Sequence, residues 1–390
     1  MTIDLLCKVV DNFGDIGVAY RLARALSELD DPPTLRIIVD NLEAFNALCP
    51  EVDPRQNVQL VRGWTVLSWH ADALMSYRSC YERDPARVVL EAFACGRPEW
   101  LETMLFDPAD LATKTIINIE YLTAEPYADE FHLMPSLTRS PLVRKYMFMP
   151  GFTANTGGLI LDGHFLDSIG HGIDSRGRQA MRVELARRLG IAAELASEQH
   201  TWIVVFGYER DYSRIVADIA EFGRQRPVVV FAANGKSQPC LEAAWQNAGR
   251  PFALERLPFL EQLVWDALLV ATDFSIVRGE DSLSRAALSG RPFLWHAYPQ
   301  DDAYQLVKVR ALLERMAPYF APDLFAPLRE TFIAFNDRTT DGPHVIGTES
   351  ILPVLQAASS LQTGFAGWSA VLASNGNMAA HLMTCIHKIV

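Results

Sequence analysis

Short apolar stretches alternate with amphipathic helical patterns along most of this chain, and this alternation constrains its fold more than any other feature. In the first half, apolar stretches lie at 5–10, 34–40, 57–64, 87–95 and 115–122, each followed by turn or helix patterns. Strands that alternate with helices pair in parallel, because each helix carries the chain back across the sheet. The sequence therefore predicts an α/β fold with doubly wound parallel sheets.

The same alternation begins again after a polar, charged passage at 174–200. Strand patterns lie at 201–208 and 226–235, and the second ends at a glycine. The stretch 268–300 then shows a strand, a turn, a helix and another strand in succession. Two halves of the same style predict two Rossmann-like domains joined near residues 155–185.

The length of the chain supports two domains. At 390 residues it exceeds the size at which a single hydrophobic core keeps growing. We expect an N-terminal domain at 1–180 and a C-terminal domain at 181–361. The amphipathic residues 362–390 have no strand of their own to cover, so we expect them to pack back on the first domain.

Composition and charge exclude several classes of function. The formal net charge of −12 argues against nonspecific binding to nucleic acid or anionic membranes, both of which reward clustered Lys and Arg. The chain shows neither a basic segment followed by an apolar one at its start nor a run of about 18 apolar residues. We therefore expect a cytoplasmic protein that binds neither membrane nor nucleic acid.

The cysteines and histidines give no metal-binding pattern. The six cysteines are scattered without a C-x-x-C pair: Cys7, Cys49, Cys80, Cys95, Cys240 and Cys385. They are expected to be reduced, small apolar residues rather than ligands or disulfides. We expect no metal site and no other cofactor.

The turn "DNFGDIG" at 11–17 follows the first strand pattern and precedes a helical one. It lacks the G-x-G-x-x-G fingerprint of dinucleotide-binding sites. Asp11 and Asp15 are nevertheless expected at the carboxyl end of a strand, where open α/β sheets bind their ligands. Gly14 and Gly17 allow the backbone to approach a ligand closely, and we count them among the candidate ligand-binding residues. The alternative is that one aspartate merely caps the helix.

A second turn, "RGEDS" at 278–282, also lies between a strand and a helix. Arg278, Ser282 and the free N–H groups at the helix start suit phosphate oxygens. Glu280 and Asp281 suit sugar hydroxyls better than phosphate. A structural capping turn explains Asp281 and Ser282 equally well, but it explains Arg278, Gly279 and Glu280 less well.

Aromatic residues near other strand ends complete a candidate nucleotide pocket in the second half. They are Phe206, Tyr208, Phe259 and Tyr298, and Gln300 follows the last of them. Bases stack on such rings, with each stack contributing about 1 to 3 kcal/mol. The alternative is that these rings are core residues.

The chain resembles a known family. The motifs "CKVVDNFGDIGVAYRLARAL", "INIEYLTAE", "PGFTANTGGL", "VRGEDS" and "GRPFLWHAYPQD" occur in the order found in the bacterial protein-arginine rhamnosyltransferases that modify elongation factor P. The matching blocks spread from residue 7 to about residue 305. The resemblance implies a GT-B fold, in which two Rossmann-like domains face each other across a cleft. It also implies transfer of rhamnose from dTDP-β-L-rhamnose to an arginine of elongation factor P, with inversion and without a metal.

The resemblance assigns roles to individual residues. Asp15, Asp11 and Glu280 are expected to be the catalytic residues. The expected donor-binding residues are Gly14, Gly17, Phe206, Tyr208, Phe259, Arg278, Gly279, Asp281, Ser282, Tyr298 and Gln300. In the family the acceptor protein docks largely on the N-terminal domain. Two alternatives stay open: a GT-B enzyme with another nucleotide sugar or acceptor, and a non-catalytic nucleotide-sugar-binding protein.

Overall fold

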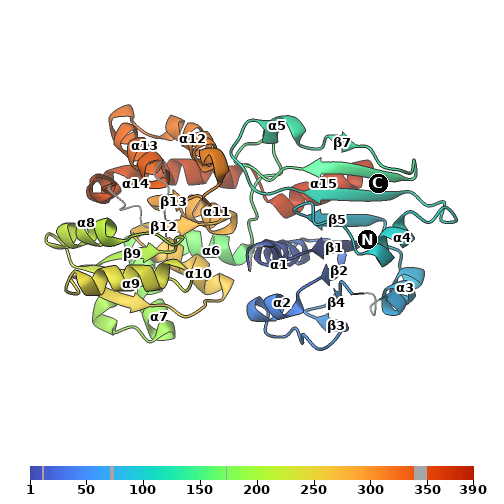
Figure 1. Ribbon diagram of the computed structural model, residues 1–390, viewed down its shortest axis with the longest axis horizontal. Coiled ribbons are helices and arrows are strands. Elements are labelled where there is room, and N and C mark those ends of the chain that lie inside the picture. The colour runs from blue at the N-terminus through green and yellow to red at the C-terminus, as the bar shows by residue number, and fades with distance from the viewer. Residues whose placement is uncertain (11–12, 71–73, 173, 338–348) are drawn as a thin grey trace. The chain divides into compact units, whose positions relative to one another are not determined.

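The computed structural model describes residues 1–10, 13–70, 74–172, 174–337 and 349–390, and these residues form two compact units. Unit 1 comprises Met1–Gly163 and Asn375–Val390, and unit 2 comprises His164–Ser374. The two α/β units confirm the expected fold class (Figure 1).

Both boundaries between the units differ from the expected ones. The first lies at Gly163 instead of residue 180, because helix α6 (Gly163–Gly172) packs on α10 (Gln262–Ala271) of unit 2. A Cβ on Gly172 would lie 2.3 Å from a methyl group of Val270. The second boundary lies after Ser374, because the long helix α14 (Leu352–Ser374) belongs wholly to unit 2.

Unit 1 is built on one eight-stranded sheet with the order β3-β4-β2-β1-β5-β6-β8-β7. The strands are β1 (Thr2–Cys7), β2 (Thr34–Val39), β3 (Val58–Val61), β4 (Trp64–Ser68), β5 (Val88–Ala92), β6 (Lys114–Ile119), β7 (Pro135–Ser136) and β8 (Val143–Phe148). All neighbours pair in parallel except β3 with β4 and β7 with β8. The single strand expected at 57–64 is instead a hairpin. Arg62 and Gly63 form its turn, with φ angles of 52° and 85°.

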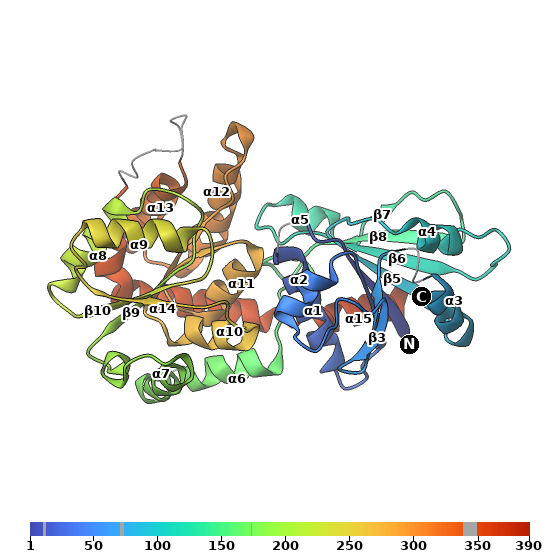
Figure 2. The ribbon, with the colours of Figure 1, turned by 60° about the horizontal axis from the view of Figure 1, so that its bottom comes forward.

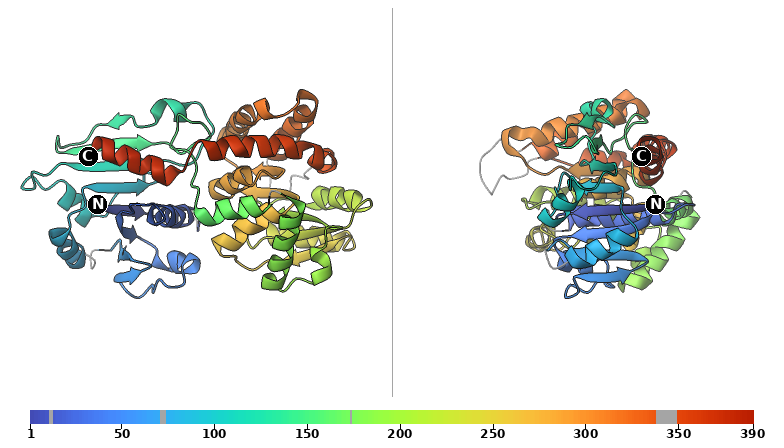
Figure 3. Two further views of the ribbon diagram at one scale, coloured as in Figure 1. Left: turned by 180° about the vertical axis from the view of Figure 1, so that it is seen from behind. Right: turned by 90° about the vertical axis from the view of Figure 1, so that its right-hand side faces the viewer.

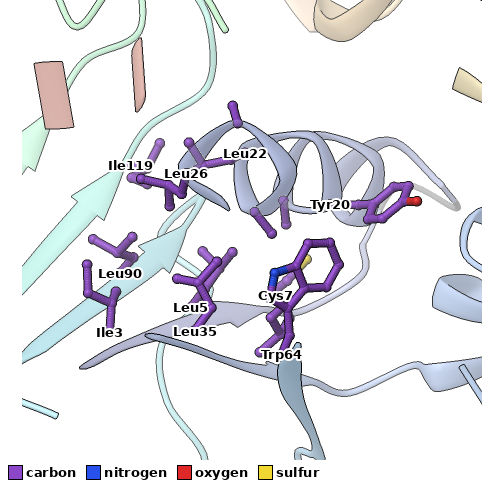
Figure 4. Close-up of a cluster of buried hydrophobic side chains, with 14 of the residues drawn as sticks. Ile3, Leu5, Cys7, Tyr20, Leu22, Leu26, Leu35, Trp64, Leu90 and Ile119 are labelled. Atoms are coloured by element: carbon purple, nitrogen blue, oxygen red, sulfur yellow. The ribbon is translucent and has the colours of Figure 1, made fainter. Parts of the chain in front are cut away.

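The helices of unit 1 pack around a core that includes the C-terminal residues. They are α1 (Gly14–Ser27), α2 (Leu42–Leu48), α3 (Leu74–Arg83), α4 (Glu99–Leu105), α5 (Tyr127–Phe131) and α15 (Met378–Ile389). Leu22 and Leu26 of α1 pack with Leu5 and Leu90 of the sheet (Figure 4). Residues of α15, among them Leu382, belong to the same cluster. The return of the C-terminal helix to the first unit is thus confirmed, and Figure 3 shows α15 beside the sheet of unit 1.

Truncation of Leu382 tests this return of the chain. Its side chain is fully buried in the core of unit 1, so Leu382→Ala should lower the free energy of unfolding by about 2 to 5 kcal/mol. Denaturant unfolding, with hydrogen exchange of the β1 amides as the local readout, measures this loss. Val371→Ala on the exposed side of α14 is the matched control and should change little. Equal effects of the two variants would contradict the packing of α15 described here.

Unit 2 contains a five-stranded, wholly parallel sheet with the order β11-β10-β9-β12-β13. The strands are β9 (Thr201–Val205), β10 (Val228–Ala232), β11 (Ala253–Arg256), β12 (Phe274–Arg278) and β13 (Phe293–His296). Strands β9 and β10 are buried along their whole length, as expected for a sheet covered on both faces. Figure 2 shows α9 and α10 on opposite sides of this sheet.

The remaining helices of unit 2 are α7 (Ser175–Leu189), α8 (Ser213–Gly223), α9 (Ser237–Asn247), α11 (Glu280–Ser289), α12 (Tyr304–Met316) and α13 (Pro322–Asn336). Short 3-10 helices lie at η2 (Ala193–Ala196), η3 (Asp301–Ala303) and η4 (Ala317–Tyr319). Within the part of the chain that the structure describes, no helix is long and apolar enough to cross a membrane.

The strand orders locate where each unit can bind a ligand. In unit 1 the chain leaves β1 toward β2 on one side and later places β5 on the other side. In unit 2 the same reversal occurs at β9, with β10 on one side and β12 on the other. Open α/β sheets bind ligands beyond the carboxyl ends of the strands at such switch points. The turns after β1, β5, β9 and β12 are therefore the expected ligand-binding positions.

Candidate active site

Asp15 lies at the switch point of unit 1, one residue into helix α1. Its side chain is buried, and its carboxylate accepts hydrogen bonds from the Val10 backbone N–H at 2.8 Å and the Tyr121 hydroxyl at 3.1 Å. The N-cap position of α1 belongs to Phe13, whose side chain makes no capping bond. Asp15 stands in the first turn of α1, at the positive end of the helix dipole, where acidic residues are common. The arrangement presents an oriented carboxylate to a cationic ligand.

Tyr121 and Phe93 extend this site across the neighbouring strands. Phe93 follows β5 and Tyr121 follows β6, and their rings stack with centroids 4.3 Å apart and planes at 13°. Phe93 has a φ of 58°, a left-handed conformation that is strained for a bulky residue. Such strain persists only where the surroundings impose it, which is common at functional sites. Sequence reasoning missed both residues, although they follow β5, which is next to β1, and β6, which is next to β5.

Two further carboxylates lie in the segment that follows β6. Glu125 is buried and accepts a hydrogen bond from the Thr123 hydroxyl at 3.1 Å. Glu120 accepts one from the side-chain amide of Asn118. The pKa of Tyr127 is raised, first by burial and then by the nearby negative charge of Glu125. The segment 120–127 therefore adds negative charge on the same edge of the sheet as Asp15.

The other sequence-predicted residues of this turn differ in what the structure says of them. Asp11 lies outside the described residues. Gly14 and Gly17 lie within helix α1, so neither uses the left-handed backbone that only glycine adopts easily. Both glycines belong to unit 1, whereas the other candidate donor-binding residues belong to unit 2.

Arg278 occupies the equivalent switch point of unit 2, at the end of β12. Its guanidinium carbon lies 4.7 Å from the ring centroid of Phe206 and 4.8 Å from that of Tyr208. Its Nε is buried and has no hydrogen-bond partner among the residues that the structure describes. Buried donors are normally satisfied, and a guanidinium presents paired donors to phosphate oxygens. The two rings and the unpaired donor fit a nucleoside diphosphate.

Helix α11 begins directly after Arg278. Gly279 is its N-cap with a φ of 68°, and Glu280 and Asp281 stand in its first turn. Ser282 is buried just behind them. A helix N-terminus offers free N–H groups to an anion, while the carboxylates are suited to hydroxyl groups. The turn is compatible with both the capping and the ligand-binding interpretation, because Glu280 lies at the helix start and beside Arg278.

Two glycines that sequence reasoning missed shape the same region. A Cβ on Gly235, after β10, would lie 3.3 Å from the Phe206 ring and 3.7 Å from Nη2 of Arg278. A Cβ on Gly207 would lie 2.3 Å from the Tyr212 hydroxyl. Close packing requires glycine at position 207, and the φ of 147° favours glycine at position 235. The signal that could have found them is a glycine directly after a predicted strand, at the edge where ligands bind.

The remaining aromatic candidates also lie at this edge of the unit 2 sheet. Tyr298 follows β13, and its ring lies edge-on to Tyr208 with centroids 5.3 Å apart. Phe259 follows β11 and is half-exposed. The structure thus brings Arg278, Tyr208 and Tyr298 together, whereas Phe259 and Gln300 follow β11 and β13, the two outermost strands of the sheet. Among the described residues, no group of three or more His, Cys, Asp or Glu could hold a metal ion.

Comparison with known proteins identifies the family. The family of the elongation factor P (EF-P) rhamnosyltransferase EarP matches residues 3–387. The chain belongs to the EarP family. It is 31% identical over 341 residues to the protein-arginine rhamnosyltransferase of Shewanella oneidensis, with 82% of each chain covered. It is 32% identical over 381 residues to that of Neisseria meningitidis, with 93% of this chain and 89% of the relative covered. The expected enzyme class, a protein-arginine rhamnosyltransferase, is confirmed.

Solved structures agree with the fold of the EarP family. A structure concerning EarP-mediated arginine glycosylation of translation elongation factor EF-P covers 100% of this chain with a TM-score of 0.62 and 22% identity. The UDP-GlcNAc 2-epimerase of Neisseria meningitidis, bound to UDP-GlcNAc, covers 100% with a TM-score of 0.52 and 9% identity. At these identities the likeness concerns the fold alone, which is of the GT-B type.

Proposed function

We propose that this member of the EarP family transfers L-rhamnose from dTDP-β-L-rhamnose to an arginine side chain of elongation factor P, with inversion at the anomeric carbon. The observation that carries the proposal is the buried, doubly hydrogen-bonded carboxylate of Asp15 at the switch point of unit 1. The names of the relatives and of the family support the sugar and the acceptor. Because the proposed acceptor is a translation factor, we propose that the enzyme acts in the cytoplasm.

Unit 2 binds the donor in this proposal. The thymine base stacks against the rings of Phe206 and Tyr208. Arg278 and the start of α11 contact the diphosphate. Glu280 accepts hydrogen bonds from sugar hydroxyls of the donor. Charge that develops on the departing dTDP is stabilised by Arg278 and the helix N–H groups, so that the reaction needs no metal and no other cofactor.

Asp15 acts on the acceptor arginine. A guanidinium has a pKa above about 12, so an ordinary carboxylate cannot remove its proton before the reaction begins. We propose that Asp15 holds the guanidinium and directs one nitrogen at the anomeric carbon. As the C–N bond forms, the C–O bond to dTDP breaks and its electron pair leaves with the diphosphate. The nitrogen becomes acidic at that stage and passes its proton to Asp15.

Tyr121 orients Asp15, and its hydroxyl offers a specific test. Tyr121→Phe removes the 3.1 Å hydrogen bond to Asp15 but keeps the ring stacked on Phe93. A hydrogen bond to a charged group contributes about 1.5 to 3 kcal/mol, so kcat should fall about tenfold or more while donor affinity stays unchanged. Steady-state transfer assays measure both. Tyr20→Phe, on the buried face of α1, is the control, and an equal loss there would contradict the role of Tyr121.

A panel of donors and acceptors separates the proposal from its two rivals. The enzyme is incubated with elongation factor P and, in turn, dTDP-β-L-rhamnose, dTDP-glucose and UDP-glucose. The proposal predicts transfer from dTDP-β-L-rhamnose alone. Efficient transfer from another donor would favour a GT-B enzyme of different specificity. Binding of the donor without single-turnover transfer would favour a non-catalytic nucleotide-sugar-binding protein.

A further inference from the structure

The edge strand β13 leads directly into the segment Ala297–Tyr298–Pro299–Gln300, here called the AYPQ segment. In the described part of the chain, β13 is the last strand of its sheet and pairs only with β12. The outward backbone groups of an edge strand have no ladder partner. The course of the AYPQ segment must therefore be set by something other than a neighbouring strand.

Asn336, the last residue of α13, takes the place of that missing strand. Its side-chain oxygen accepts the Ala297 backbone N–H at 2.8 Å, and its Nδ2 donates to the Trp295 carbonyl at 2.9 Å. A carbonyl at one residue and an N–H two residues later point to the same side of a strand, so a single amide group can pair with both. Nδ2 also donates to the Phe332 carbonyl at 2.9 Å, which ties the end of α13 to the sheet edge.

Gln305, near the start of α12, holds the other end of the AYPQ segment. Its side-chain oxygen accepts the Gln300 backbone N–H at 3.1 Å, and its Nε2 donates to the Asn336 backbone carbonyl at 3.3 Å. Both Asn336 and Gln305 are only 3% exposed, so these hydrogen bonds are shielded from water. A buried polar group that lacks a hydrogen-bond partner destabilises the fold, so these hydrogen bonds favour one specific arrangement.

The residues between these two anchors are the exposed ones. Tyr298 is 61% exposed and lies edge-on to Tyr208, which in turn contacts Arg278. Directly after the segment, Asp302 and Ala303 adopt left-handed φ angles of 55° and 54°. Non-glycine residues hold this conformation only where the surroundings fix it. The chain thus fixes the backbone on both sides of two exposed, chemically capable side chains.

A third contact joins the same strand end to the Arg278 pocket. The buried His296 accepts the Tyr208 backbone N–H at its Nδ1, at 3.1 Å, and its ring packs edge-on against Tyr208 and Phe335. Phe335 precedes Asn336 on α13. The end of α13 is therefore linked both to the AYPQ segment and to the turn that carries Tyr208.

We propose that Asn336 and Gln305 are positioning residues, which hold the AYPQ segment so that Tyr298 and Gln300 contact the nucleotide sugar bound beside Tyr208. This inference rests on the proposed function, because it concerns the same donor. Neither residue touches the reacting atoms. Their loss should loosen the AYPQ segment and weaken donor binding, while the chemical step, which depends on Asp15, continues at its usual rate once the donor is bound.

Two substitutions remove one anchor each with little change in shape. Asn336→Asp keeps an oxygen that can accept the Ala297 N–H but cannot donate to the Trp295 and Phe332 carbonyls. Gln305→Met is uncharged, similar in length and unable to accept the Gln300 N–H, so it carries the test if Asn336→Asp does not fold. Thr272→Val is the matched control, because it removes the buried hydroxyl that donates to the Trp202 and Phe274 carbonyls just before the start of β12, roughly 20 Å along the strand from Arg278.

Two readouts on the full-length protein decide the matter. Hydrogen exchange of the peptide that contains the AYPQ segment should be faster in Asn336→Asp and Gln305→Met than in the wild type and Thr272→Val. The KM for dTDP-β-L-rhamnose should rise about tenfold in the same two variants, with kcat and the acceptor KM within about twofold of wild type. Calorimetry with dTDP should show weaker donor-side binding in both.

The possible failures are distinguishable. If the wild type transfers rhamnose but both variants keep the wild-type KM and exchange rate, the positioning roles are overturned. If kcat falls and the KM for the donor does not rise, Asn336 and Gln305 act on the chemical step or on stability rather than on donor binding. That result also overturns the inference. If the wild type transfers no rhamnose, the proposed function fails, while faster exchange in the two variants still supports the anchoring of the AYPQ segment.

Discussion

Asp15→Asn should nearly abolish transfer while leaving the donor affinity intact. The amide keeps the size of the carboxylate, its oxygen can still accept the Val10 N–H, and its NH2 group can donate to the Tyr121 hydroxyl oxygen, so the fold of the turn should survive. It cannot accept the proton that the acceptor nitrogen releases, and it does not neutralise a guanidinium. General acid–base groups contribute about 10² to 10⁴ in rate, so we expect a loss of kcat in that range. Single-turnover transfer and calorimetry with the donor measure the two quantities separately.

Asp40 provides a matched control for this substitution. It follows β2, next to β1, and its carboxylate accepts the Val9 backbone N–H at 2.8 Å, much as Asp15 accepts that of Val10. Asp40→Asn therefore removes a charge from the same edge of the sheet without removing the proposed proton acceptor. It should retain most of the activity. Equal losses of activity in the two variants would mean that negative charge at this edge of the sheet matters, and not Asp15 itself. Weakened donor binding in Asp15→Asn would mean that Asp15 acts on the donor rather than on the acceptor.

Glu280→Ala should weaken donor binding by about 10- to 100-fold, because hydrogen bonds between a carboxylate and hydroxyl groups contribute about 1.5 to 3 kcal/mol. Glu280 begins α11 beside Arg278, at the switch point of unit 2. Calorimetry with dTDP-β-L-rhamnose measures the loss. Glu221→Ala on the surface of α8, where Glu221 pairs with Arg224, serves as the control. Unchanged affinity in Glu280→Ala would contradict its assignment to the donor.

Much of the fold follows from the sequence because strand and helix patterns are local. The alternation of apolar strands and amphipathic helices predicted two α/β units, and the parallel sheets confirm it. The hairpin at Arg62 and Gly63 was missed, because a left-handed arginine gives no compositional signal. The boundary at Gly163 was missed as well. It depends on α6 packing against α10, a contact between segments about a hundred residues apart that no local pattern reveals.

The candidate site, like the fold, is only partly predictable from the sequence. Asp15 and the "RGEDS" turn stand out in the sequence, since charged residues between a strand and a helix are locally recognisable. Tyr121 and Phe93 do not, because the stacking of Tyr121 on Phe93 and the hydrogen bond from Tyr121 to Asp15 depend on β1, β5 and β6 being consecutive in the sheet. Asn336 lies still further from any motif. Its role depends on the end of α13 meeting the edge of β13, which only the tertiary structure shows.

The most direct test of the central claim is mass spectrometry of elongation factor P after incubation with this protein and dTDP-β-L-rhamnose. The proposal predicts that intact acceptor gains the mass of one deoxyhexose and that fragmentation places it on an arginine. The Asp15→Asn variant, at the same concentration, should leave the acceptor nearly unmodified. An acceptor that gains no deoxyhexose with the wild type, or gains it equally with Asp15→Asn, would contradict the account.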